Sequence, residues 1–246
     1  MKIFSAILKN SRNFELLCAV LKDMVVDITI IITNESIMTS SIDKNNSLLL
    51  SICLPSSSFS HFYNLQQRIK ININTIDLYK IINKIQKNEI ELFIEEEHFI
   101  NYIVNILSIK IDNIVIELNL LENEQEELNV MKIDYDLIFS INSSVFKNIV
   151  KSINNVSEYL VISCTQENSI EMSSNSTFAK FIIKPQYNII QFKKINTVYI
   201  DLFILNILSK FTSISDLIDI HLSNDLPLFL SYKLNDLCIF HIYISS

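Results

Sequence analysis

The 246 residues contain no glycine, and this absence limits both the turns and the functional motifs that the chain can form. Glycine lets a backbone approach a phosphate closely or turn tightly, as phosphate-binding loops, dinucleotide-binding turns and nucleophile elbows require. None of these motifs can be present in its standard form. Turns with a positive φ must instead use Asn or Asp, which tolerate this conformation well. Such residues occur in suitable places, among them Asn34-Glu35, Lys87-Asn88, Asp112-Asn113 and Asn224-Asp225.

The composition indicates a soluble, intracellular protein with ample material for a core. Hydrophobic residues make up 49% of the chain. No apolar run reaches the roughly 18 residues that would span a membrane. The N-terminal MKIFSAIL is followed by Lys9, Asn10 and Arg12 and by no cleavage-site pattern, so it is not expected to be a signal peptide. The four cysteines lie apart within apolar runs, which predicts buried, reduced thiols: Cys18, Cys53, Cys164 and Cys238.

The most acidic stretch lies near the middle of the chain, at residues 117–135 (ELNLLENEQEELNVMKIDY). Burying unpaired carboxylates costs several kcal/mol each, so this stretch should cross the surface as an extended connector. On either side the same order of strand, helix, strands, strand, helix and strands occurs, which indicates an internal repeat. We predict an α+β fold of two similar domains, each an antiparallel sheet with helices on one side. The domains would be residues 1–121 and 135–246, and the acidic interdomain connector residues 122–134.

Hydrophobic periodicity places the individual elements. In the first half it predicts strands at residues 3–8, 26–32, 36–40, 47–54, 68–73, 89–95, 99–106 and 109–118, with helices at 11–24 and 75–85. In the second half it predicts strands at residues 136–142, 159–165, 169–173, 177–184, 197–200, 217–222, 226–234 and 237–245, with helices at 143–153 and 201–210. Ser11 and either Ser143 or Ser144 are the expected helix caps.

Several stretches, taken together with their order, resemble DNA sliding clamps, the proliferating cell nuclear antigens of eukaryotes, archaea and some large viruses. They are residues 41–50 (SIDKNNSLLL), 54–59 (LPSSSF), 158–164 (EYLVISC) and 224–234 (NDLPLFLSYKL), with Phe4 and Leu21-Lys22-Asp23 at the start. The acidic connector stands in the place of the family's interdomain connector. The resemblance implies the DNA clamp fold and a ring-forming homotrimer that encircles duplex DNA. It implies that the protein is a processivity factor that tethers DNA polymerase and repair enzymes.

In such a ring the helices line the channel. The resemblance implies that lysines beside the apolar helix faces contact DNA phosphates without reading sequence: Lys22, Lys80, Lys84, Lys147, Lys151 and Lys210. The net charge of −7 argues against a protein that simply coats DNA, but a ring can be acidic outside and basic in its channel. The alternative is that these lysines are ordinary solvated helix surface. Glu15 and Asn148 stand where the family has basic residues, so this channel should be less charged.

The resemblance also implies a groove beneath the connector for partner peptides of the form Gln-x-x-aliphatic-x-x-aromatic-aromatic. The matching residues are Ile42, Leu49, Leu128, Val130, Pro227 and Tyr243. Core packing is the alternative for Ile42, Leu49 and Tyr243. The chain ends at Ser245-Ser246, where the family has Ala-Pro and a short tail, so one wall of the groove should differ.

Ring closure would join an edge strand near residues 109–117 of one subunit to an edge strand near residues 177–184 of the next. The resemblance places Ile114, Ile116, Phe178 and Phe181 in this subunit interface. It also implies a clamp loader that opens the ring. The protein would work in the nucleus, or in the cytoplasm of an archaeal cell or of a cell infected by a cytoplasmic virus.

Other functions are weighed against this one. Glu95-Glu96-Glu97-His98 contains metal-ligand types, but charges at a turn between strands are normally solvated. Asp216 and Asp219 near His221 are no better candidates, because strand alternation sends the two carboxylates to opposite faces. We therefore expect no catalytic residue, metal or cofactor. Within the clamp class, a subunit of a heterotrimeric checkpoint-type clamp and a clamp-fold viral replication or transcription factor stay open.

Overall fold

In the computed structural model the chain forms two compact units. The first comprises residues 1–46, 50–130 and 234–240, and the second comprises residues 47–49, 131–233 and 241–246. The residues that the structure describes are 1–9, 11–43, 47–83, 89–122, 128, 133–154, 156–166, 169–194, 196–209, 212, 215–234 and 237–244.

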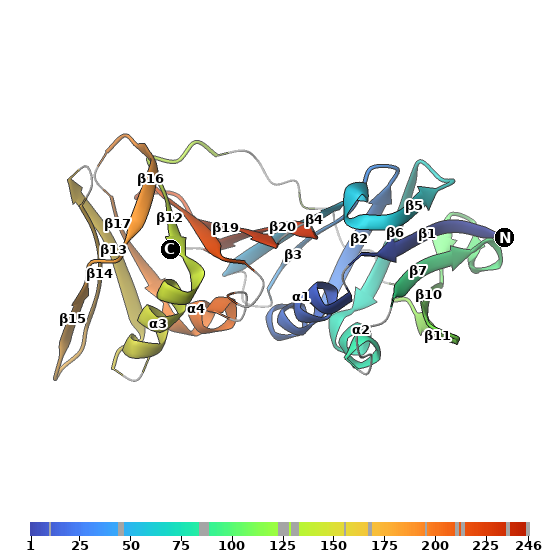
Figure 1. Cartoon of the computed structure of the whole chain (residues 1–246), viewed down its shortest axis with the longest axis horizontal. Coiled ribbons are helices and arrows are strands. Elements are labelled where there is room, and N and C mark those ends of the chain that lie inside the picture. Colours follow the sequence, from blue (N-terminus) through green and yellow to red (C-terminus); the bar gives the residue numbers. More distant parts are fainter. Residues whose placement is uncertain are drawn as a thin grey trace. The chain divides into compact units, whose positions relative to one another are not determined.

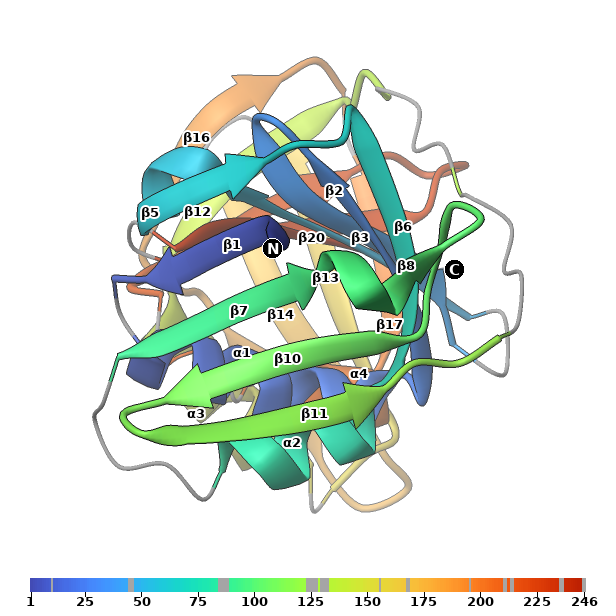
Figure 2. The ribbon, with the colours of Figure 1, turned by 90° about the vertical axis from the view of Figure 1, so that its right-hand side faces the viewer.

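The first unit is built of antiparallel strands with two α-helices. Its elements are β1 (Lys2–Leu8), α1 (Ser11–Met24), β2 (Asp27–Thr33), β3 (Ser36–Ile42), β4 (Leu48–Pro55), η1 (Ser56–Ser58), β5 (Phe59–Asn64), β6 (Arg68–Asn74), α2 (Thr75–Ile82), β7 (Ile90–Glu95), η2 (Glu96–His98), β8 (Phe99–Ile100), β9 (Ile103–Val104), β10 (Ile106–Ile111) and β11 (Ile114–Asn119). Figure 2 shows one sheet in the order β11-β10-β7-β1-β5, from the bottom upward. Strands β4, β3, β2 and β6 are neighbours in that order in a second sheet.

The second unit has the same kinds of element. They are β12 (Leu137–Asn142), α3 (Ser143–Ile153), β13 (Tyr159–Gln166), β14 (Ser169–Asn175), β15 (Lys180–Ile183), β16 (Tyr187–Phe192), β17 (Asn196–Asp201), α4 (Leu202–Leu208), β18 (Leu217–Leu222), β19 (Leu228–Leu234) and β20 (Cys238–Ile244). One sheet has the order β15-β14-β13-β17, and the strands β16, β12, β18, β19 and β20 follow one another in a second. The predicted α+β class, with two similar domains of antiparallel sheet, is confirmed.

In each unit the two α-helices lie together on one side of the strands (Figure 1). Their apolar sides enter the core: Phe14, Leu17 and Leu21 of α1 are buried, as are Phe146 and Ile149 of α3. Helix periodicity therefore directs the described lysines predicted for DNA contact, Lys22, Lys80, Lys147 and Lys151, away from the apolar sides of their helices. Cys18, Cys164 and Cys238 are buried as expected, while Cys53 is only half-buried.

Asparagine, rather than serine, caps α2 and α3. The Asn74 side chain accepts hydrogen bonds from the backbone N–H groups of Ile76 and Asp77. Asn142 does the same for Ser144 and Val145, so the expected cap at Ser143 or Ser144 is wrong. An Asn side chain caps as well as Ser, and Asn142 stands one residue earlier, where the chain leaves β12. Ser11 is the first residue of α1, and the position before it lies outside the described residues.

The segment from Phe99 to Asn119 folds as two hairpins where the sequence predicted two single strands. The first is β8–β9, with Asn101 and Tyr102 both at positive φ (51° and 67°). The second is β10–β11, in which the predicted turn Asp112-Asn113 is confirmed, with Asp112 at φ 52°. A continuous isoleucine-rich pattern concealed the first reversal, and it favoured one strand across the second although the turn there was recognised. Tyrosine in the left-handed region is uncommon, so sequence rules for turns do not anticipate it.

Two strands escaped prediction. β5 follows the serine cluster, and its buried and exposed residues do not alternate. β16 contains a β-bulge, because its register against β12 shifts between Ile138 and Phe139. A bulge adds a residue and breaks the period of two on which strand prediction depends. Of helix 75–85, α2 reaches Ile82, and the predicted end at Ile85 lies outside the described residues.

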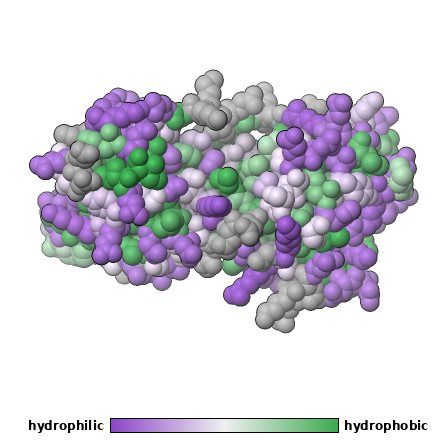
Figure 3. Space-filling view, turned by 45° about the horizontal axis from the view of Figure 1, so that its top comes forward, coloured by the Kyte–Doolittle hydropathy of each residue, from purple (hydrophilic) through white to green (hydrophobic). Residues whose placement is uncertain are grey.

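Figure 3 shows hydrophilic residues over most of one face, with hydrophobic residues gathered in small patches between them. Within the described parts of the chain, no helix is both long enough and apolar enough to cross a membrane.

Candidate functional site

Two cations on the helices of the first unit, Lys22 and Lys80, are paired with carboxylates. Lys22 Nζ lies 3.5 Å from the Asp23 carboxylate and 4.5 Å from the centre of the Tyr79 ring, which joins α1 to α2. Lys80 Nζ lies 2.8 Å from Asp77 one turn earlier. The sequences of α1 and α2 balance three cations against three carboxylates. Surface pairs of this kind are weak, so phosphate can compete for these lysines.

In the second unit, helix α3 carries cations without carboxylates. Neither α3 nor α4 contains Asp or Glu, and α3 contributes Lys147 and Lys151. Lys147 is half-buried and its Nζ lies 3.2 Å from the Thr212 hydroxyl, while Lys151 is exposed in the last turn. Two further predicted cations, Lys84 and Lys210, lie outside the described residues. The described helix surface is thus more basic in the second unit than in the first.

Each unit ends one of its sheets in a strand with exposed apolar residues. In the first unit this strand is β11, where Ile114 is 63% and Val115 52% exposed and Ile116 is half-buried. In the second it is β15, where Ile182 is 51% exposed and Phe181 half-buried, with Phe178 exposed just before it. An open edge with apolar side chains is a template for pairing with another chain.

The direction of the free backbone groups follows from two hydrogen bonds. The N–H of Leu120 donates to the Asn105 carbonyl (2.9 Å), and that of Ser176 to the Ala179 carbonyl (2.9 Å). Hydrogen-bonded and non-hydrogen-bonded pairs alternate along an antiparallel ladder. From the registers, Val115 and Glu117 on β11 direct their N–H groups away from β10, and Lys180 and Ile182 direct theirs away from β14.

Two of the residues predicted for the peptide groove are described in the first unit, Leu128 and Ile42. A surface hollow of about 450 Å³ has Leu128 of the connector in its lining, with residues of β2, β3 and the start of β6, including Ile31, Met38 and Arg68. Ile42, at the end of β3, is exposed. Val130 lies outside the described residues.

The other residues predicted for the groove that the structure describes belong to the second unit. Leu49, Pro227 and Tyr243 are all half-buried, so none of them is a fully enclosed core residue. The hydroxyl of Tyr135 donates a hydrogen bond to the Pro227 carbonyl (3.1 Å). Tyr243 stacks on Phe229, with ring centres 4.6 Å apart.

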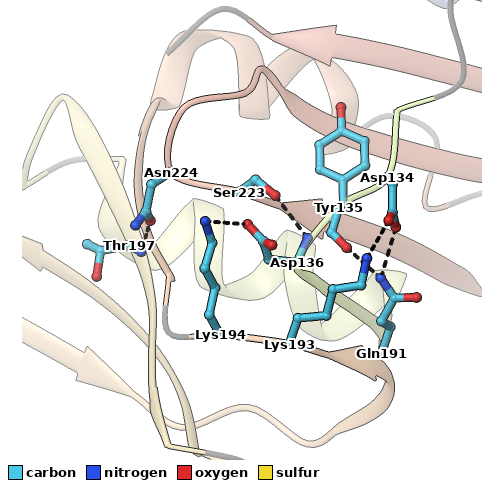
Figure 4. Close-up of polar contacts among 9 residues, drawn as sticks. All are labelled: Asp134, Tyr135, Asp136, Gln191, Lys193, Lys194, Thr197, Ser223 and Asn224. Carbon is cyan, nitrogen blue, oxygen red and sulfur yellow. Dashed lines mark hydrogen bonds and ion pairs between the residues drawn. The ribbon is translucent and has the colours of Figure 1, made fainter.

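The connector enters the second unit through a set of polar contacts (Figure 4). Lys193 Nζ lies 2.5 Å from Asp134, and Lys194 Nζ lies 3.2 Å from Asp136. Gln191 donates to the Tyr135 carbonyl (2.5 Å), and the Asp136 N–H donates to the Ser223 hydroxyl (2.9 Å). The hydrogen bond with Lys193 lowers the pKa of Asp134, and contact with the Ser223 hydroxyl, with Lys194 nearby, lowers that of Asp136. These contacts fix the chain around Tyr135, whose ring points away from them.

Sequence reasoning missed these anchoring residues and the rings behind Tyr243. The sequence places two adjacent lysines, Lys193 and Lys194, in the same half of the chain as two aspartates, Asp134 and Asp136. These opposite charges could have indicated ion pairs. The rings of His221, Phe229 and His241 gave no signal, because each lies alone within its own strand. They come together only when β18, β19 and β20 align.

The described residues include one group with metal-ligand geometry. Ligand atoms of Glu95, Glu97 and His98 lie within 4.8 Å of one another on and beside η2. Glu97 is exposed and sits 3.8 Å from the His98 ring, as solvated charges at a turn commonly do. In the other acidic group, Asp219 accepts a hydrogen bond from Ser140 across the β12–β18 ladder.

The partly buried His221 predicts a pH dependence of stability. Burial lowers its pKa from 6.5 to about 4, with His241 nearby adding to the effect and Asp219 opposing it. Between these values the unfolded chain binds the proton and the folded chain does not, so the free energy of unfolding falls as the pH falls. We expect a loss of about 2 kcal/mol over this interval, allowing for partial solvation. Thermal unfolding from pH 7 to pH 4 should show a shallower slope for His221→Gln than for the wild type, and equal slopes would contradict the assignment.

Comparison with known proteins agrees with this architecture. The family model for the proliferating cell nuclear antigen, N-terminal domain, matches residues 3–127, and that for the C-terminal domain matches residues 129–246. The chain is 22% identical to a proliferating cell nuclear antigen of Dictyostelium discoideum over 250 residues, covering 96% of this chain and 95% of that protein. It is 26% identical over 160 residues to a DNA polymerase sliding clamp of Nitrosopumilus maritimus, covering 65% of this chain and 62% of that protein.

The fold agrees as well. The crystal structure of a proliferating cellular nuclear antigen from Entamoeba histolytica superposes with a TM-score of 0.88 at 19% identity, covering 100% of this chain and 99% of that one. Two family models in the right order account for almost the whole sequence. The chain therefore belongs to the proliferating cell nuclear antigen family of DNA sliding clamps.

Proposed function

We propose that the protein is a processivity factor for DNA polymerase, a clamp that encircles duplex DNA as a ring of three copies. The observation that carries this function is the match of both domains of the clamp family, in order, over nearly the whole chain. The family is one of non-catalytic scaffolds, and we infer that this member has no catalytic activity of its own. It would work where the replicating DNA lies: the nucleus, or the cytoplasm for an archaeal or cytoplasmic viral clamp.

The division into domains at residues 1–121 and 135–246, with a connector at 122–134, belongs to this proposal. The boundary between the two family models, at residues 127 and 129, falls inside that connector and supports it. The helices would face the DNA. Lys22, Lys80, Lys147 and Lys151, together with Lys84 and Lys210, would meet phosphates, which makes binding independent of sequence and sensitive to salt.

The ring would close by pairing β11 of one copy with β15 of the next. Both strands end their sheets, both expose apolar side chains, and both direct free N–H groups outward. Ile114, Ile116, Phe178 and Phe181 would lie at this junction. Each copy would therefore supply both of the edges that a junction needs, which favours a homotrimer. A clamp loader would open this ring.

Two alternatives within the clamp class make different predictions. A subunit of a heterotrimeric checkpoint-type clamp should stay a monomer of 28.5 kDa until other chains are added. A homotrimer should show three times that mass alone. Sedimentation of the purified protein decides between them, and retention on circular but not linear DNA then tests encirclement. A clamp-fold viral transcription factor would fail to increase polymerase processivity.

The partner groove gives a direct binding test. A peptide of the form Gln-x-x-aliphatic-x-x-aromatic-aromatic should bind, and Leu128→Ser should weaken it. Losing one buried aliphatic side chain costs about 1.5–3 kcal/mol, or about 10- to 150-fold in affinity. Leu65→Ser is a matched control, because Leu65 is exposed in the same unit and does not line the hollow. Equal affinities for both variants, measured by calorimetry, would remove Leu128 from the site.

A further inference from the structure

Four aromatic rings converge on Phe229 within the second unit. Phe229 lies parallel to Tyr243 at 4.6 Å (11°) and packs against the edge of His241 at 5.0 Å (81°). His221 lies 4.4 Å away and Tyr135 5.8 Å away. Four rings thus contact one central ring, and they come from β18, β19, β20 and the segment before β12.

The cluster is tied to two of the groove residues proposed in this unit, Tyr243 and Pro227. Tyr243 is stacked on the central ring itself. Pro227 lies two positions before Phe229, and its carbonyl accepts a hydrogen bond from the Tyr135 hydroxyl. Tyr135 is in turn held by the polar contacts on either side of it (Figure 4). A change at Phe229 would therefore reach the groove through Tyr243, without Phe229 having to touch the partner.

We infer that Phe229 is a positioning residue that fixes the plane of the Tyr243 ring, so that the groove prefers peptides ending in aromatic side chains over peptides ending in aliphatic ones, and that His221 and His241 make this preference sensitive to acid. This inference rests on the proposed peptide groove. Aromatic pairs gain from a defined offset or edge-on geometry beyond the area that they bury, whereas aliphatic contacts are nearly independent of ring orientation. A fixed Tyr243 ring therefore favours an aromatic partner by about fivefold.

The acid sensitivity follows from the surroundings of the two imidazoles. Burial lowers the pKa of both, and His241 also lowers that of His221 where the two rings meet at Phe229. The titratable groups nearest to them are Asp219 on β18, which favours protonated His221, and the Tyr135 and Tyr243 hydroxyls, whose pKa values burial raises. The exposed Lys233 lies farther along β19.

A bound peptide would remove more water from these half-buried rings and oppose their protonation further. Binding would then release protons at acidic pH, so the affinity should fall as the pH drops towards about 4, the pKa of His221 in the folded chain. At neutral pH both rings are uncharged and the effect should be absent.

The test uses the full chain and two peptides without Asp, Glu or His. One has the form Gln-x-x-Leu-x-x-Phe-Phe, and the other ends in Leu-Leu. The variants are Phe229→Leu, Phe229→Tyr, the double change His221→Gln with His241→Gln, and Ser231→Ala as a control on the same face of β19. Dissociation constants are measured at about pH 7.5 and about pH 4.5.

At the higher pH we expect Phe229→Leu to lose the preference of about fivefold and to leave the Leu-Leu peptide within about twofold of the wild type. Phe229→Tyr should restore it, and Ser231→Ala should not change it. At the lower pH the wild type should lose affinity, and the double histidine variant should not. If Phe229→Leu proves unstable, Tyr243→Leu should abolish the preference in the same way.

Four outcomes would overturn the inference. Equal weakening of both peptides by Phe229→Leu would mean that the ring has only a structural role. An unchanged preference in that variant would mean that it has no role in the groove. Failure of the wild type to bind either peptide would overturn the proposed groove, and the inference with it. A wild type that binds both peptides without preference contradicts the inference while leaving the groove intact.

Discussion

Replacing Ile182 with proline is expected to convert the ring into single, folded chains of 28.5 kDa. Ile182 sits opposite Ser173 in a pair of the β14–β15 ladder whose N–H groups face away from each other. Its N–H is therefore free to bond a neighbouring subunit, and proline has none. The lost bond and the clash of the ring together cost about 2 kcal/mol at each interface, or about 30-fold in its dissociation constant. Sedimentation at low micromolar concentration should detect the change.

Phe181→Pro is the contrasting variant. Phe181 sits opposite Ser174 in a hydrogen-bonded pair, so its N–H serves its own sheet. Proline there should lower the thermal midpoint, whereas Ile182→Pro should leave it nearly unchanged. On the other edge, Val115→Pro should act like Ile182→Pro, and Ile114→Pro should disturb the β10–β11 hairpin. Trimers that survive both Ile182→Pro and Val115→Pro would show that these edges do not join the subunits.

The elements that the sequence predicted well are those with a complete period. The apolar face of α1, with Phe14, Leu17 and Leu21, repeats at helical spacing, and its predicted bounds agree with the structure. The alternation in β13 and β14 likewise placed Leu160, Ile162 and Met172 in the core. In such elements the apolar residues recur on one side over several periods, so a single exceptional residue does not change the predicted element.

The failures come from residues that break a period or that act only across strands. The β-bulge in β16 and the left-handed Tyr102 are local exceptions that composition does not indicate. The ion pair between Lys80 and Asp77 could be foreseen from their spacing of three. The meeting of His221, Phe229 and His241 could not, because it depends on the register between strands rather than on any spacing within one.

Among the predictions for DNA binding, the largest effect is expected from the difference in helix charge between the two units. Changing Lys147 and Lys151 together to alanine should reduce DNA association far more than changing Lys22 and Lys80. The first pair lies on a helix without carboxylates, so its full charge acts on the phosphates. Lys22 and Lys80 each form an ion pair with an aspartate. A phosphate that binds either lysine must replace this ion pair, so the net gain in binding free energy is smaller.

The measurement is association with linear duplex DNA between about 50 and about 200 mM salt, where each phosphate contact contributes about 0.9 to the logarithmic slope. The Lys147 and Lys151 variant should lower the slope by several units per trimer, because the change occurs once in each subunit. Lys110→Ala with Lys233→Ala is the matched control, since it removes the same charge from exposed positions on strands. Polymerase stimulation should fall in the same order, with the mass of the trimer unchanged. If all three double variants give one slope, net charge rather than a basic helix surface governs binding, and the helices do not face the DNA.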